Sequence, residues 1–74
     1  MKMNEKKIIE IVSKHAKVSL EKINENSSTE NIDTWDSLAH VRIIVELGEL
    51  TNIKINTSDF GEFNSIKKLT EKFV

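Results

Sequence analysis

Asp36 and Ser37 are the two neighbouring residues whose types and position could do chemistry. They follow a polar stretch and precede an apolar run that begins at Leu38, so Ser37 is expected at the start of a helix. In the simpler interpretation, a serine in that place is only a helix N-cap. Its hydroxyl can also carry a phosphate, because the free amides and the dipole of a helix N-terminus favour one. Asp36 can simply cap the helix or form an Asx turn.

Neither histidine completes a catalytic or metal-binding set. His40 lies three residues after Ser37, a spacing that could bring both to one helix face. A nucleophile and base would also need an orienting group and an oxyanion site, and the sequence supplies neither. We expect His40 to be solvated or partly packed and His15 to lie at the edge of an apolar helix face. Two separate histidines without clustered ligands predict no metal site, and we expect no catalytic residue.

The composition narrows the class of protein. The 74 residues hold 11 basic and 12 acidic side chains, which argues against a nucleic-acid binder. There is no cysteine, so any thiol chemistry must come from a cofactor. No apolar run reaches membrane-spanning length, and Glu5 and Glu10 interrupt any signal-like segment at the start. We expect one domain over residues 1–74, monomeric and cytoplasmic.

The apolar spacing predicts helices separated by one long loop. The first helix is expected over 4–17, the second over 37–50, a short third over 59–63 capped by Thr57 or Ser58, and a fourth capped by Ser65. The fourth helix should share one face among Ile66, Leu69 and Phe73. Residues 18–36 are rich in turn and cap formers, and loops of this length are uncommon unless they are functional. The loop's expected anchors to the core are apolar: Val18, Leu20, Ile23 and Ile32.

The second helix carries two apolar stripes. One is formed by Ile43, Ile44, Leu47 and Leu50; the other is formed by Leu38, Val41 and Val45. One stripe suffices to bury a surface helix, so the second indicates either a central helix or a patch kept for a partner. Ile53 and Ile55 are expected to plug the core from an extended connector. Gly48 costs the helix about 1 kcal/mol relative to alanine, and the sequence does not explain it.

The triplet Asp36-Ser37-Leu38 and the apolar helix after it resemble the acyl carrier protein family, as does the order helix, long loop, helix, short helix, helix. The resemblance covers nearly the whole chain and implies an all-α, four-helix bundle with a long first loop and a short third helix. It implies that Ser37 carries a 4′-phosphopantetheine arm from coenzyme A, whose thiol holds acyl or aminoacyl groups as thioesters. It also implies that Asp36 helps a phosphopantetheinyl transferase bind metal and seat the serine.

The resemblance further assigns the stripe of Leu38, Val41 and Val45 to partner recognition, with Arg42 beside it. Trp35 is interpreted either as an anchor for the loop or as a contact surface beside the arm. The expected partners are the transferase, an acyl-loading or adenylating enzyme, and downstream enzymes of a biosynthetic pathway.

Some positions differ from those of fatty-acid carriers. Thr34-Trp35 stands where those proteins usually have Gly-Ala, and Ala39 and Arg42 stand where they have acidic residues. The chain is also far less acidic overall. These differences favour a discrete carrier for a dedicated pathway. The alternatives are a housekeeping fatty-acid carrier and, from another class, a small helical interaction module without a prosthetic group.

Overall fold

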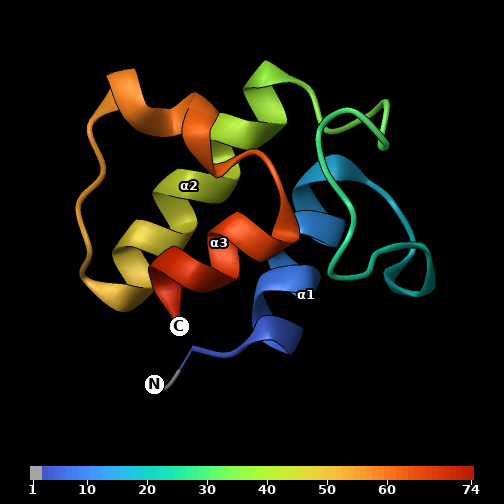
Figure 1. Cartoon of the computed structure of the whole chain (residues 1–74), viewed down its shortest axis with the longest axis horizontal. Coiled ribbons are helices and arrows are strands. Elements are labelled where there is room, and N and C mark those ends of the chain that lie inside the picture. Colours follow the sequence, from blue (N-terminus) through green and yellow to red (C-terminus); the bar gives the residue numbers. More distant parts are fainter. Residues whose placement is uncertain (1–2) are drawn as a thin grey trace.

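The computed structural model describes residues 3–74, and this part of the chain is helical (Figure 1). Three α-helices, α1 (Glu5–Ala16), α2 (Ser37–Thr51) and α3 (Ile66–Phe73), are joined by two 3₁₀ helices, η1 (Leu20–Lys22) and η2 (Thr57–Phe63). The all-α arrangement of four main helices, with a long first loop and a short third helix, is as predicted; η2 is that third helix. None of the helices in residues 3–74 is long and apolar enough to cross a membrane.

Helix α1 forms one wall of the core. Asn4 caps it by accepting a hydrogen bond from the backbone N–H of Lys7 (2.8 Å), and Lys17 ends it in the left-handed conformation. Its buried face consists of Ile8, Ile11, Val12 and Ala16. Helix α1 packs mainly against α2 and also against α3. The predicted range of 4–17 is confirmed once both caps are included.

The loop between α1 and α2 is held to the body at several points. Ile23 and Ile32 are buried, and Val18 packs against the core as expected. The prediction for Leu20 is wrong: it is 52% exposed, because it opens the η1 turn, none of whose residues is buried. Two backbone hydrogen bonds join the middle of the loop to the start of α3, Ile66 N–H to Ser27 O and Thr29 N–H to Asn64 O.

The connector after α2 explains Gly48. Asn52 adopts a left-handed conformation (φ 63°) that ends α2 and turns the chain back along it. A Cβ at position 48 would lie 2.9 Å from the carbonyl oxygen of Ile53. A glycine is therefore needed at position 48, where the backbone of the connector comes close to the helix. Ile53 and Ile55 then pack against the core, as predicted.

The C-terminal helices close the core. Helix η2 begins after Asn56, and neither Thr57 nor Ser58 caps it, so that prediction is wrong: the helix starts at Thr57 itself and has no side-chain cap. Ser65 caps α3 by accepting from the backbone N–H of Lys68 (3.1 Å). The three residues predicted to share a face of α3 are all buried: Ile66, Leu69 and Phe73.

Candidate functional site: the start of helix α2

Ser37 is exposed and is the first residue of α2. The cap belongs to Asp36, whose Oδ1 accepts from the backbone N–H of Ala39 (2.9 Å). The interpretation of Ser37 as the N-cap is therefore wrong, because the aspartate before it takes the helix amide. Within residues 3–74 the Ser37 hydroxyl makes no hydrogen bond. The hydroxyl is thus reachable from solvent and lies at the positive end of a 15-residue helix.

Trp35 and His40 hold the segment around Ser37 in place. The indole N–H of Trp35 donates to Nδ1 of His40 (3.0 Å). Because an indole N–H can only donate, Nδ1 must be the accepting nitrogen, and the ring proton must sit on Nε2. That Nε2–H donates to the carbonyl oxygen of Phe60 in η2 (2.7 Å). One neutral tautomer therefore connects the end of the loop, the first turn of α2 and η2, which lies beside that turn (Figure 1).

These contacts correct two expectations. His40 is buried rather than solvated or partly packed, with 7% of its surface exposed. Both of its ring nitrogens are occupied, so it cannot act as a base toward Ser37. Trp35 is 2% exposed, which supports the anchor and contradicts the interpretation of it as a contact surface for partners.

The two stripes of α2 separate as predicted, with one exception. Ile43, Ile44 and Leu47 are buried, whereas Leu38, Val41 and Val45 are 60%, 44% and 47% exposed. Leu50 was expected in the core but is 39% exposed. It lies in the last turn of α2, where it adjoins Lys7 and Glu10 on the polar side of α1 instead of the core.

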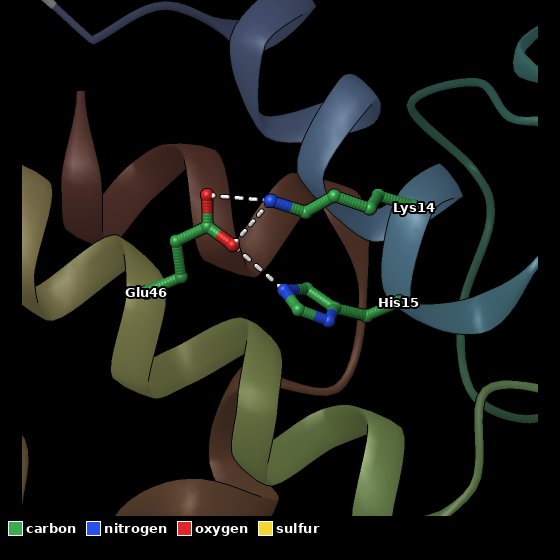
Figure 2. A network of polar contacts seen from close by, with 3 residues as sticks. All are labelled: Lys14, His15 and Glu46. Carbon is green, nitrogen blue, oxygen red and sulfur yellow. Dashed lines mark hydrogen bonds and ion pairs between the residues drawn. The ribbon is translucent and has the colours of Figure 1, made fainter.

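A polar network of Lys14, His15 and Glu46 joins α1 to α2 (Figure 2). His15 and Glu46 line one surface hollow with Val41 and Val45 of the exposed stripe. The Lys14 ammonium lies 2.7 Å and 2.9 Å from the two carboxylate oxygens of Glu46. Nε2 of His15 lies 2.7 Å from Oε1 of the same carboxylate. The hydrogen bond from Lys14, aided by His15 and opposed by partial burial, lowers the pKa of Glu46 below its ordinary value of 4.5. Glu46 is therefore ionised at neutral pH and is held by α1.

No group of three or more histidine, cysteine, aspartate or glutamate side chains within residues 3–74 is arranged to hold a metal ion. A surface hollow lies between the end of α1 and the start of α2, lined on one side by Lys17 and on the other by Asp36, Leu38 and Arg42. The start of α2 therefore offers an exposed hydroxyl with charged and apolar neighbours, and no catalytic constellation around it.

Comparison with known families identifies the class of protein. The sequence profile described as "Phosphopantetheine attachment site" matches residues 6–73, which is most of the chain. The search of curated proteins found no match to the chain. The chain belongs to the family of phosphopantetheine-binding carrier domains, as its sequence predicted, and is a carrier rather than an enzyme. Its cofactor is 4′-phosphopantetheine, which argues against the interaction module without a prosthetic group.

Proposed function

We propose that Ser37 is the attachment point of the phosphopantetheine arm. The observation that carries this proposal is the exposed, unbonded Ser37 hydroxyl at the first position of α2, in a chain whose family is defined by such an attachment. A phosphodiester at Ser37 would meet the positive end of the helix dipole and the amides that Asp36 leaves free. Ser65, the serine at the start of α3, differs because its hydroxyl already accepts from the backbone N–H of Lys68.

Asp36 and Leu38 support the attachment in different ways. Asp36 uses Oδ1 for the cap, and its second carboxylate oxygen accepts no hydrogen bond from residues 3–74. That oxygen is available to a metal ion that a phosphopantetheinyl transferase brings to the serine. Leu38 places the most exposed apolar side chain of α2 directly after Ser37. The bound arm supplies a thiol, which this cysteine-free chain lacks, and the thiol holds an acyl or aminoacyl group as a thioester.

The recognition face consists of Leu38, Val41, Arg42 and Val45 in this proposal. Three exposed apolar side chains in sequence along one helix form a patch of the kind that marks interaction sites. Ala39 is buried and Arg42 is exposed, so neither position presents the acidic charge that the family resemblance associates with fatty-acid carriers. We therefore favour a carrier that serves a dedicated biosynthetic pathway. A housekeeping fatty-acid carrier is the alternative.

The test is incubation of the chain with coenzyme A, magnesium and a broad-specificity phosphopantetheinyl transferase, followed by intact mass measurement. The wild type should gain one phosphopantetheine and Ser37→Ala should gain none. Ser65→Ala is the matched control, since it removes a hydroxyl from another helix start, and it should be modified like the wild type. Modification of Ser37→Ala, or none of the wild type with several transferases, would refute the attachment site.

A further inference from the structure

Two opposite charges remain unpaired on the outer face of α2. Arg42 and Glu49 are exposed, and neither forms an ion pair with any other part of residues 3–74. Both line one surface hollow together with Val41 and Val45. They lie seven residues apart, which is about 10 Å along a helix axis and nearly the same angular position. The face therefore carries a positive charge nearer Ser37 and a negative charge nearer the end of α2, with Val45 between them and Val41 next to Arg42.

A third charge on this side of α2, that of Glu46, is paired with side chains of helix α1. Glu46 lies between Arg42 and Glu49 in sequence, but its carboxylate is held by Lys14 and His15 (Figure 2). An acidic side chain that is already paired attracts a partner's basic group far less than a free one. The network thus leaves Arg42 and Glu49 as the unpaired charges of this face and weakens the effect of Glu46 on a partner.

We infer that the partner enzyme docks here with the reciprocal pattern. Its docking patch would place an acidic side chain against Arg42, apolar side chains against Val41 and Val45, and a basic side chain against Glu49. The acidic and basic groups of the partner would lie about 10 Å apart. This inference rests on the proposed function, because the partner is taken to work on a group carried at Ser37. Charge of this kind chiefly sets the encounter rate and excludes wrong partners.

A second copy of the chain fits the same face less well. An antiparallel pair of α2 helices would match Arg42 with Glu49 of the other copy on both sides. In that register Leu38 would lie opposite position 53, which is beyond the end of α2 at Thr51. The most exposed apolar side chain of the helix would stay uncovered. An enzyme that reaches for Ser37 would cover it.

The test uses a malonyl transferase that docks its carriers through a basic patch, and a variant of it in which one basic residue of that patch is replaced by Glu. The chain is first fully modified with phosphopantetheine, as verified by intact mass, and kcat/KM for loading is then measured at low salt. We expect the charge-inverted transferase to load the chain about three- to tenfold faster than the original. Arg42→Gln should abolish this preference and Arg42→Glu should reverse it, and the preference should shrink as salt rises.

Lys67→Glu is the matched control: it makes the same charge change at an exposed position of α3 and should leave the preference unchanged. Equal loading by the two transferases, or the same response in Lys67→Glu as in Arg42→Glu, would overturn the inference. Sedimentation showing a dimer of the wild type that Arg42→Glu dissociates would also overturn it, in favour of a second copy. A chain that accepts no arm would overturn the proposed function along with it, whereas a loaded chain without preference overturns this inference alone.

Discussion

The two sides of helix α2 are made of similar apolar residues, but one side is buried and the other is exposed. On one side Ile43 and Leu47 are fully buried, while on the other Val41 and Val45 are almost half exposed. The difference lies in which neighbours reach each side. Helices α1 and α3 pack against the inner side, and Lys14 and His15 cross from α1 only as far as Glu46. Apolar character therefore identifies two stripes on the helix, and packing decides which of them is buried and which stays exposed.

The strongest test of this contrast is one substitution on each side. Leu47→Ala should lower the free energy of unfolding by about 2–5 kcal/mol, because it leaves a cavity in the core. Val45→Ala should change it by at most about 0.5 kcal/mol and act instead on loading by partner enzymes. Chemical denaturation measures the free energy of unfolding of both variants and of the wild type. Equal destabilisation would mean that the division of α2 into a core side and a recognition side is wrong.

A smaller effect is expected where the inner side meets the connector. By helix propensity alone, Gly48→Ala would stabilise α2 by about 1 kcal/mol. The close approach of the Ile53 carbonyl opposes this gain, because overpacking costs about 1–3 kcal/mol, and we expect a net loss of up to about 2 kcal/mol. Gly61→Ala is the control, since a Cβ there meets nothing within 4 Å and should be nearly neutral. A Gly48→Ala variant that is more stable than the wild type by the full propensity gain of about 1 kcal/mol would show that the connector does not pack as described.

The smallest effect is expected at the boundary between the two sides. Glu46→Gln removes the ion pair with α1 and should cost up to about 1 kcal/mol at neutral pH, since the carboxylate is partly exposed. The pKa of Glu46 is lowered in the folded chain, so its contribution is present above the ordinary value of 4.5 and is lost as pH falls through the lowered value. The stability difference between wild type and Glu46→Gln should therefore fade in acid.

Thermal unfolding across a pH series measures this difference, with Glu49→Gln as the control for loss of an unpaired carboxylate on the same helix. A difference between Glu46→Gln and the wild type that persists below the pKa of Glu46 would contradict the assigned role. So would an equal effect of Glu49→Gln.

Local patterns in the sequence predict most of the fold. Helical spacing and cap residues are short-range signals, and they predict α1, α2 and α3, including the cap at Ser65. Errors occur where long-range packing decides the outcome. Leu20 is apolar but lies in a turn that does not reach the core, and Leu50 continues a stripe past the point where the core ends.

The class of protein was predicted from the sequence, the attachment at Ser37 stays a prediction, and the contacts that hold the start of α2 in place were missed. The Asp36-Ser37-Leu38 triplet indicates the carrier site from sequence alone. The link from Trp35 through His40 to Phe60 was missed because the last contact spans 20 residues and involves a backbone carbonyl. The joining of Glu46 to Lys14 and His15 was missed for a similar reason, since it depends on how α1 and α2 pack.

The central claim is that Ser37, at the exposed start of α2, is where the arm is attached. The most direct measurement is proteolytic digestion of the transferase-treated wild type, followed by tandem mass spectrometry that locates the added phosphopantetheine. We predict that the whole addition lies on the peptide containing Asp36-Ser37-Leu38, and on Ser37 within it. An addition found on another serine, such as Ser28, Ser58 or Ser65, would contradict the account.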